Sequence, residues 1–194
     1  LLRRMAIQVA HRTGEILVTL ETGRGETKAL AGLARDLMRR HPGVVGVVRR
    51  TRADPGRSAQ ASILVGRDHL FEEVDGDRLM VPAGAFFQPN VFALARLRRE
   101  AVDLLDPRAD EAILELYCGV GFLTLAAARG AGSVLAVEGS REAVAAARHN
   151  AARAGIGNAR FLCREISAAL PGLLRETDWG ALLLDPPRSG LPRG

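Results

Sequence analysis

A glycine-containing turn in the middle of the chain has the residue types of a nucleotide-binding site. The segment Glu115-Leu116-Tyr117-Cys118-Gly119-Val120-Gly121 places a short apolar run directly before two glycines. Glycines at this position let the backbone approach a ligand that lies over the carboxyl end of a strand. A dinucleotide fingerprint has Gly or Ala where this chain has Thr124, and a Walker-type loop needs a nearby lysine that is absent here. The pattern therefore weakens the interpretation of the turn as a pyrophosphate site.

An acidic residue follows this turn at the distance expected of a ribose-binding carboxylate. Glu138 ends the next predicted strand, 17 residues after Gly121. A carboxylate at that place can accept hydrogen bonds from both ribose hydroxyls. The alternative is a tight strand-to-helix turn followed by a surface glutamate. We favour a ligand that contains a nucleoside.

A proline-rich loop near the end of the chain supplies another acid. In Asp185-Pro186-Pro187-Arg188-Ser189-Gly190, two prolines stiffen the loop and remove two amide donors. Such a loop would fix Asp185 at the carboxyl edge of the sheet, although a rigid surface turn with an exposed acid is the alternative. Together with the glycine turn and Glu138, it predicts a Rossmann-like site for S-adenosyl-L-methionine. Amino-methylating enzymes with related loops have an aromatic residue where this chain has Arg188, which argues against that chemistry.

A pair of aromatic residues with a carboxamide occurs where the two halves of the chain meet. The segment Phe86-Phe87-Gln88-Pro89-Asn90 could stack a base and contact its hydrogen-bonding edge. A packed linker is the alternative, because phenylalanine is more often a core residue than a stacking surface.

Composition places the chain among globular proteins. Of its 194 residues, 47% are hydrophobic and 25% are charged, which excludes disordered and collagen-like chains. The net charge is +5, almost every basic residue is an arginine, and a basic domain is compatible with a polyanionic partner. Two groups of arginines are candidates for RNA contact or are simply solvated faces, and we favour the first for phosphate contact: Arg49, Arg50, Arg52 and Arg57 around one loop, and Arg96, Arg98 and Arg99 on one helix.

The cysteines and the hydrophobicity pattern indicate the compartment. Cys118 and Cys163 are too few for a disulfide framework or a four-cysteine metal site, so we predict no metal and a reducing environment. The longest apolar stretch, residues 112–128, contains Glu115 and two glycines and is too short to span a membrane. The beginning of the chain lacks the apolar core of a signal peptide. The prediction is a cytoplasmic protein without a membrane partner.

The elements that must position these residues fall into two groups. Residues 1–85 are predicted to form a small α+β domain, in which short β-type runs alternate with one helix. One hairpin turns at residues 12–14 and another at Asp75-Gly76. The predicted strands are 6–9, 16–20, 44–48, 62–65, 70–74 and 78–81, the helix covers 30–38, and residues 49–57 form a loop.

Residues 86–194 are predicted to form the N-terminal part of a methyltransferase domain that binds S-adenosyl-L-methionine. Strands alternate with helices, which indicates a parallel sheet. Asn90 is expected to cap a helix whose buried face carries Leu94, Leu97, Ala101 and Leu104. The predicted strands are 112–117, 133–137, 159–162 and 181–184, with helices at 123–129 and 141–154. The fold class is thus α/β, an incomplete Rossmann-like methyltransferase sheet preceded by a small α+β domain.

The motifs quoted above stand in an order and spacing that resembles the RNA uracil-C5 methyltransferase family, whose members modify 23S ribosomal RNA or transfer RNA. The strong motifs cover residues 86–190, and the strand pattern of residues 1–85 is similar to the central domain of that family. The resemblance implies that Phe86 and Gln88 lie next to the target uracil and that Glu138 contacts the ribose of the cofactor. The cofactor-binding residues that it implies are Gln88, Tyr117, Gly119, Gly121, Glu138 and Asp185.

The resemblance also implies where the catalytic groups are. In the family a cysteine thiolate adds to C6 of uracil, C5 attacks the methyl group, and a base removes the C5 proton. The cysteine, in a Ser-Cys-Asn-Pro-like segment, and the basic glutamate lie downstream of the Asp185 loop. We therefore expect both beyond residue 194, and no catalysis by residues 1–194 alone. Cys118 belongs to the cofactor turn and Cys163 follows the third strand, so neither takes that role.

The chain departs from the family in further respects. The upstream cysteines that bind an iron–sulfur cluster in some members are absent, as is a complete RNA-binding β-barrel domain. Glu115 stands where many members have aspartate. Phe122 replaces a commonly polar residue, which removes one possible hydrogen bond to the cofactor.

A methyltransferase sheet of seven strands needs three more strands, and they would pair beside strand 181–184. We therefore expect that strand to be poorly ordered, paired with another molecule or covered by a rearranged segment. An ordered strand with Leu182–Leu184 exposed would argue against this strand order.

The predicted function is methylation of C5 of a uridine in ribosomal or transfer RNA, and of these we favour 23S ribosomal RNA. One alternative is a methyltransferase that acts on another base or on a protein. The other is a non-catalytic RNA-binding module, which the arginines and the Phe86-Phe87 pair would permit.

Overall fold

The computed structural model describes residues 2–23, 25, 28–51, 60–187 and 190. The chain divides into two compact units. Unit 1 comprises residues 1–73 and 81–84, and unit 2 comprises residues 74–80 and 85–194. The domain boundary predicted between residues 85 and 86 lies one residue from the change of unit between residues 84 and 85. The segment Val74–Met80 falls in the first predicted domain but packs with unit 2.

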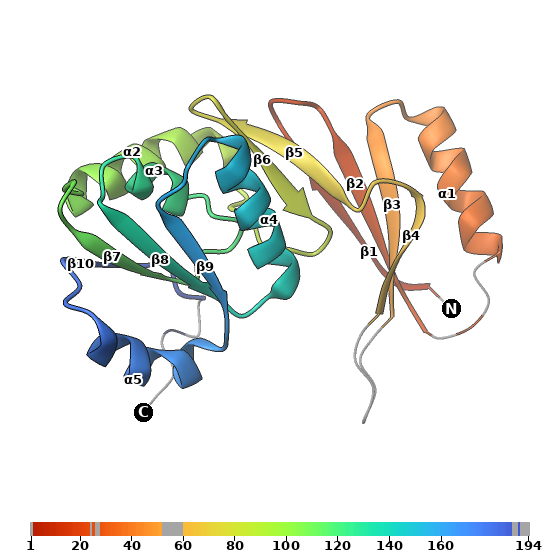
Figure 1. Ribbon diagram of the computed structural model, residues 1–194. Coiled ribbons are helices and arrows are strands. Elements are labelled where there is room, and N and C mark those ends of the chain that lie inside the picture. The colour runs from red at the N-terminus through yellow and green to blue at the C-terminus, as the bar shows by residue number, and fades with distance from the viewer. Residues whose placement is uncertain (1, 24, 26–27, 52–59, 188–189, 191–194) are drawn as a thin grey trace. The chain divides into compact units, whose positions relative to one another are not determined.

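Unit 1 is built around a four-stranded mixed sheet with the order β1-β2-β3-β4 (Figure 1). β1 and β2 form the predicted antiparallel hairpin, and β3 and β4 are also antiparallel. β2 and β3 are parallel, because the helix α1 lies between them in the chain and returns it to the same end of the sheet. The elements are β1 (Leu2–Val9), β2 (Ile16–Thr22), α1 (Lys28–Arg40), β3 (Val44–Thr51) and β4 (Gln60–Gly66).

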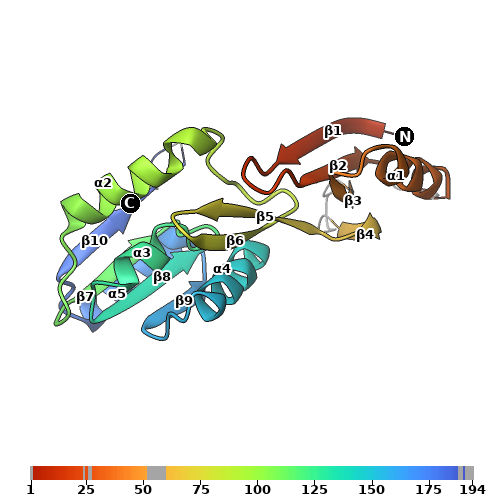
Figure 2. The same ribbon diagram turned by 90° about the horizontal axis from the view of Figure 1, so that it is seen from above.

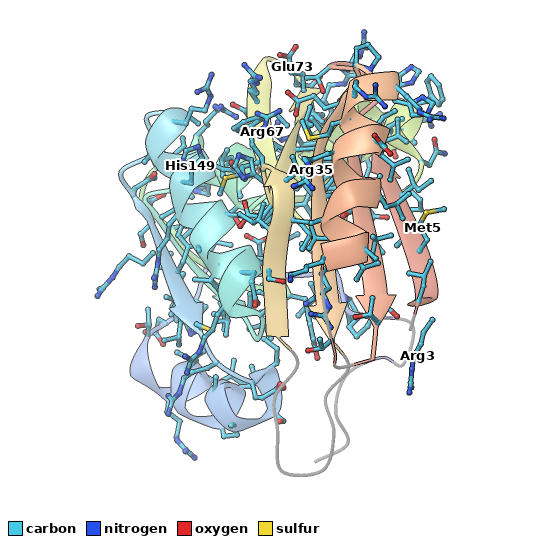
Figure 3. All side chains as sticks on the ribbon, turned by 90° about the vertical axis from the view of Figure 1, so that its right-hand side faces the viewer. Arg3, Met5, Arg35, Arg67, Glu73 and His149 are labelled. Carbon is cyan, nitrogen blue, oxygen red and sulfur yellow. The ribbon has the colours of Figure 1, made fainter. Side chains whose placement is uncertain are left out.

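The core of unit 1 lies between α1 and one face of this sheet. Ala34 of α1 packs against Leu20 and Val47, which are fully buried. Met5 is paired with Leu20 and therefore points to the same face, but it lies on the edge strand and stays exposed. Figure 3 shows Met5 and Arg3 on β1, beside the helix that carries Arg35.

The strands β5 (His69–Val74) and β6 (Asp77–Pro82) form a separate hairpin. Its turn residues Asp75 and Gly76 have positive φ angles of 47° and 83°. Two left-handed residues are what a tight two-residue hairpin turn requires, and Asp-Gly is a favoured pair there. The predicted hairpin is confirmed.

Unit 2 contains a parallel sheet with the order β10-β7-β8-β9. The helices α2, α3 and α4 lie on one face of the sheet and α5 lies on the other (Figure 1, Figure 2). The predicted α/β class with a Rossmann-like parallel sheet is confirmed. The elements are a 3-10 turn (Val91–Ala93), α2 (Leu94–Leu105), β7 (Ala112–Leu116), α3 (Thr124–Ala128), β8 (Ser133–Glu138), α4 (Arg141–Arg153), β9 (Ala159–Cys163), α5 (Ile166–Glu176) and β10 (Ala181–Leu184).

The prediction for the buried face of α2 is partly wrong. Leu94 is buried as expected, but Leu97 and Leu104 are 41% and 88% exposed, and the inward residue one turn after Leu94 is Arg98. An arginine is tolerated there because its guanidinium group bonds to the buried carboxylate of Asp77. Asn90 precedes the 3-10 turn and makes no side-chain capping bond, so α2 begins three residues later than predicted.

The helix α5 was not predicted. Glu165, the residue before the helix, makes no side-chain capping bond, so the usual signal for a helix start is missing. Pro171 lies inside the helix, where proline normally argues against one. The helix forms because Ile166, Ala169 and Leu173 bury an apolar stripe against the sheet.

The strand β10 lies at an edge of the sheet and pairs only with β7 in the described part of the chain. Leu183 packs inward, whereas Leu182 and Leu184 are exposed. The edge position is as predicted. The strand is nevertheless ordered, and Leu182 and Leu184 are 46% and 37% exposed, which argues against the predicted strand order. Main-chain pairing with β7 and partial burial of Leu183 hold the strand in place.

Candidate cofactor-binding site

The turn that follows β7 has an unusual backbone. Tyr117, Gly119 and Gly121 have positive φ angles of 63°, 54° and 84°. Glycine adopts this conformation freely, whereas a tyrosine there costs about 1–2 kcal/mol. The ring of Tyr117 offsets part of that cost by packing against the cluster that contains Leu114 and Val137. Strain of this kind is found where a surrounding structure fixes a functional conformation.

Glu138 connects the end of β8 to this turn. Its Oε2 accepts a hydrogen bond from the Gly119 amide at 3.2 Å, and its Oε1 accepts one from the Ser140 amide at 2.8 Å. Each carboxylate oxygen can accept a second hydrogen bond. Glu138 is therefore oriented by the backbone and still has acceptor capacity for two ribose hydroxyls.

Gln88 and Asp185 meet at the carboxyl end of the sheet. The Nε2 of Gln88 donates a hydrogen bond of 3.0 Å to Oδ2 of Asp185, across 97 residues of sequence. Asp185 follows β10, which is adjacent to β7, so its position is set by the sheet. Two residues predicted from separate motifs are thus brought together.

Glu115 is a buried acid at the same end of β7. It is 3% exposed, and its Oε2 has no hydrogen-bond partner among the described residues; the buried Oγ1 of Thr124 has none either. Burial raises the pKa of Glu115 from 4.5 to about 7, although the neighbouring Thr124 hydroxyl opposes the rise, and the charge of Asp185 adds to it. A buried carboxyl oxygen without a partner indicates that something else is to be bound there.

These residues fit S-adenosyl-L-methionine. A Cβ added to Gly119 would find no atom within 4 Å, so there is open space over the turn. Glu138 has the acceptor capacity that a ribose requires, and Glu115 has an oxygen without a hydrogen-bond partner among the described residues. An acidic set that includes Asp185 suits a ligand that carries a sulfonium and an ammonium group.

The aromatic pair of the linker divides into two roles. Phe86 is 72% exposed and remains a candidate for stacking on a base. Phe87 instead meets the edge of the Phe122 ring, with 6.0 Å between the ring centres, and belongs to the core. The Arg98 guanidinium carbon lies 5.4 Å from the centre of the Phe122 ring. Phe122 therefore packs within the protein and offers no hydrogen bond to a ligand.

The two cysteines lie in different environments. Burial raises the pKa of the Cys118 thiol, and the carboxylates of Glu115 and Glu138 raise it further, which argues against Cys118 as a nucleophile. Cys163 is the last residue of β9, and its sulfur is 3.7 Å from the carbonyl oxygen of Gly139.

The hypothesis that Arg49 contacts RNA phosphates is wrong. Arg49 is 9% exposed, and its guanidinium group donates to Thr22 Oγ1 at 2.8 Å and to the carbonyls of Gly23 and Gly25 at 2.8 and 3.2 Å. Its donors hold the segment after β2. Two other members of the predicted group, Arg52 and Arg57, lie outside the described residues.

Arg50 and the second arginine group are also engaged within the protein. Arg50 is half-buried, and its guanidinium group occupies the space that a Cβ on Gly84 would need. Arg98 is buried against Asp77, whereas Arg96 bonds to Glu100 at 2.7 Å on the surface. The α2 arginines therefore do not form one solvated face.

Sequence reasoning missed the buried polar residues that support the site. Asp77 accepts from Arg98 at 2.5 Å and from both terminal nitrogens of Arg129 at 2.6 and 3.0 Å. Asn150 of α4 is 1% exposed and makes three hydrogen bonds. An asparagine on the alanine-rich buried face of a helix is the signal that could have identified it.

Two features are absent from the described part of the chain. No helix there has the length and apolar character needed to cross a membrane. Within the same residues, no group of three or more His, Cys, Asp or Glu side chains is placed to bind a metal ion.

Comparison with known proteins agrees with this geometry. The model of the family described as tRNA (uracil-5-)-methyltransferase matches residues 54–193. A protein of Thermosynechococcus vestitus named as an uncharacterized RNA methyltransferase is 34% identical over 98% of this chain and 43% of its own length. A protein of the same description from Gloeobacter violaceus is 32% identical over 97% and 41%. The chain thus spans less than half the length of these relatives.

Solved structures show the same fold. The tRNA (uracil-54, C5)-methyltransferase of Pyrococcus abyssi, solved with S-adenosyl-L-homocysteine, matches with a TM-score of 0.70 at 22% identity, over 98% of this chain and 45% of that one. The tRNA m1G37 methyltransferase of M. jannaschii matches with a TM-score of 0.55 at 18% identity, over 94% and 53%.

Proposed function

Because the chain belongs to the tRNA (uracil-5-)-methyltransferase family, we propose that its protein methylates C5 of a uridine in RNA, with S-adenosyl-L-methionine as methyl donor. The observation that carries the proposal is the hydrogen bond between Gln88 and Asp185. It joins the carboxamide expected beside the uracil to the acid expected beside the cofactor. A reacting base and a methyl donor must meet at such a place.

The residues of this chain would have distinct tasks. Glu138 would bind the ribose of the donor, and Gly119 would leave room for it. Gln88 uses one N–H on Asp185 and keeps a carbonyl oxygen and a second N–H. That pair of groups is complementary to the N3–H and O4 edge of uracil. Phe86 would stack on the base.

The bound donor would supply an electrophilic methyl group on sulfur. Uracil C5 is a weak nucleophile until a thiolate adds to C6, and we propose that a cysteine beyond residue 194 forms this adduct. Loss of the C5 proton to a base and expulsion of the thiolate would restore the ring. In residues 1–194 the protein would thus hold and align the reactants.

We propose that the substrate is 23S ribosomal RNA or transfer RNA. Unit 1 would provide part of the RNA-binding surface, because its 13 basic residues exceed its 8 acidic ones. The arrangement favours neither RNA, so both must be offered.

The test uses the whole protein, S-adenosyl-L-methionine, and rRNA and tRNA transcripts that carry tritium at uridine C5. Methylation at C5 must release one tritium for each methyl group transferred. Gln88→Ala should reduce release at least tenfold, whereas Asn158→Ala, which removes bonds to the carbonyls of Ala128 and Ala131, should not. Methyl transfer without tritium release would indicate another base or a protein substrate. RNA binding without any affinity for S-adenosyl-L-homocysteine would indicate a binding module.

A further inference from the structure

The middle residue of the glycine turn is held through its backbone. Val120 lies between Gly119 and Gly121, and its carbonyl oxygen accepts a hydrogen bond of 2.9 Å from Nδ2 of Asn150. Asn150 is on the buried face of α4, and Ala147, one turn earlier, lies 3.3 Å from where a Cβ of Gly121 would be. The helix α4 therefore contacts two consecutive residues of the turn.

The same carboxamide binds a second segment. The amide of Met80 donates to Oδ1 of Asn150 at 2.7 Å, and Nδ2 of Asn150 donates to the Met80 carbonyl at 3.2 Å. With the bond to Val120, the acceptor and both N–H groups of the carboxamide have partners, as its burial requires. Asn150 thus links the backbone of β6 to the backbone of the turn.

The β6 end of this link is itself fixed within unit 2. Met80 belongs to the segment Val74–Met80, which packs with that unit. Asp77 of the segment is bonded to Arg98 and Arg129, and Arg98 also donates to the carbonyl of Val74 at 3.1 Å. Because the β6 segment is fixed by buried ion pairs, its hydrogen bonds to Asn150 fix the position of the carboxamide that holds Val120.

We propose that Asn150 is a positioning residue for the cofactor. By holding the Val120 carbonyl, it keeps the Gly119 amide on Glu138 and so keeps Glu138 aimed at the ribose. Removal of the carboxamide frees the middle of the turn while the glycines on either side allow it to move. The proposal rests on the proposed function only in taking this turn as the cofactor site.

The chain contains a matched control. Asn158 also donates Nδ2 to backbone carbonyls, those of Ala128, Ala131 and Gly132, at 2.8, 2.9 and 3.5 Å. These carbonyls lie before β8, at the amino ends of the strands, and not in the glycine turn. Loss of Asn158 therefore removes a similar structural role without touching Val120.

Calorimetry measures the binding of S-adenosyl-L-homocysteine to Asn150→Ala and to Asn158→Ala, at a temperature well below the unfolding midpoint of each variant. Both variants should unfold at a lower denaturant concentration than the unmodified protein. Only Asn150→Ala should bind S-adenosyl-L-homocysteine more weakly, by about tenfold, which is roughly the contribution of one hydrogen bond. Amide exchange at Gly119 and Gly121 should accelerate only in that variant. If Asn150→Ala does not unfold cooperatively, Asn150→Ser, which keeps a hydroxyl donor, replaces it with the same expectation.

Two results would overturn the proposal: a folded Asn150 variant with the affinity of the unmodified protein, or an equal loss of affinity in Asn158→Ala. Failure of the unmodified protein to bind S-adenosyl-L-homocysteine is a different outcome. It would overturn the proposed function, and this inference with it.

Discussion

Each unit of the molecule contains a buried glutamate, and the two are in opposite states. Glu72 of unit 1 is 2% exposed and accepts hydrogen bonds from three backbone amides, those of His11, Arg12 and Glu73, at 2.6, 3.0 and 2.9 Å. Glu115 of unit 2 is similarly buried, yet its Oε2 has no hydrogen-bond partner among the residues that the structure describes. A buried acid with all its neighbours in place holds a fold, whereas one left incomplete at the end of a parallel strand marks a binding site.

The distribution of charge follows the same division. Unit 1 has 13 basic and 8 acidic residues and therefore accounts for the whole net charge of +5, while unit 2 has 14 of each. The residues expected to bind cofactor and uracil all lie in unit 2. Attraction for a polyanion and the chemistry of the site are thus properties of different parts of the chain.

The largest effect expected is in unit 2, from Asp77→Asn. The pKa of Asp77 lies below its usual value, because the guanidinium groups of Arg129 and Arg98 outweigh the effect of burial. Loss of the carboxylate leaves Arg98 buried without its partner, so we expect unfolding to become easier by about 3–5 kcal/mol. Denaturant titration measures this. Asp75→Asn in the same hairpin is the control, because its contact with Arg99 is at 3.5 Å and largely exposed. An equal loss in the control would refute the account.

The comparison of the two glutamates is tested by Glu72→Gln and Glu115→Gln. The amide nitrogen of the first variant would face backbone N–H groups, so we expect a loss of about 3 kcal/mol in unfolding free energy. Glu115→Gln should change stability at pH 7 far less, or raise it, since it removes an unsatisfied acid. Both values come from equilibrium unfolding. Similar losses at the two positions would mean that the glutamates have the same role.

The pH dependence of stability separates them further. The folded-state pKa of Glu115, about 7, lies above its ordinary value of 4.5, so the folded protein binds this proton more tightly than the unfolded chain. The unfolding free energy should therefore fall as pH rises from about 4.5 to about 7, by an amount on the order of 3 kcal/mol, and stay level above. Stability curves of the unmodified protein and Glu115→Gln should converge at low pH. Parallel curves would contradict the raised pKa.

The smallest effect concerns the basic unit. Arg49→Ala should lower the unfolding free energy by about 1.5 kcal/mol, because Arg49 holds Thr22, Gly23 and Gly25. It should leave the salt dependence of RNA binding unchanged, since a buried guanidinium releases no counterions. Filter binding at several salt concentrations measures the slope. A flatter slope would return Arg49 to the RNA-binding surface.

Local patterns were sufficient to predict much of unit 2. The glycine turn, Glu138 and Asp185 lie after strands, and the rules of parallel sheets bring such positions to one edge. The same reasoning anticipated the Asp75-Gly76 hairpin from two residues. In each case the deciding interactions lie within a few residues or follow from topology.

The errors arise where a distant partner decides. Arg98 points inward because Asp77, 21 residues earlier, neutralises it, and nothing near Arg98 in the sequence reveals that. Arg49 is buried for the same kind of reason, since its acceptors lie at and after the end of β2. Pro171 lies inside α5, where packing of Ile166 and Leu173 on the sheet outweighs the missing hydrogen bond. Composition identifies such residues but cannot assign their partners.

The link made by Asn150 has a consequence for how the sequence can change over evolutionary time. Its three hydrogen bonds end on main-chain atoms of Met80 and Val120, and every amino acid except proline offers those atoms. These bonds therefore place no requirement on the side chains at positions 80 and 120, whereas the carboxamide at 150 has no substitute of the same size and donors. Among relatives we expect a nearly invariant asparagine at position 150 that does not covary with positions 80 and 120.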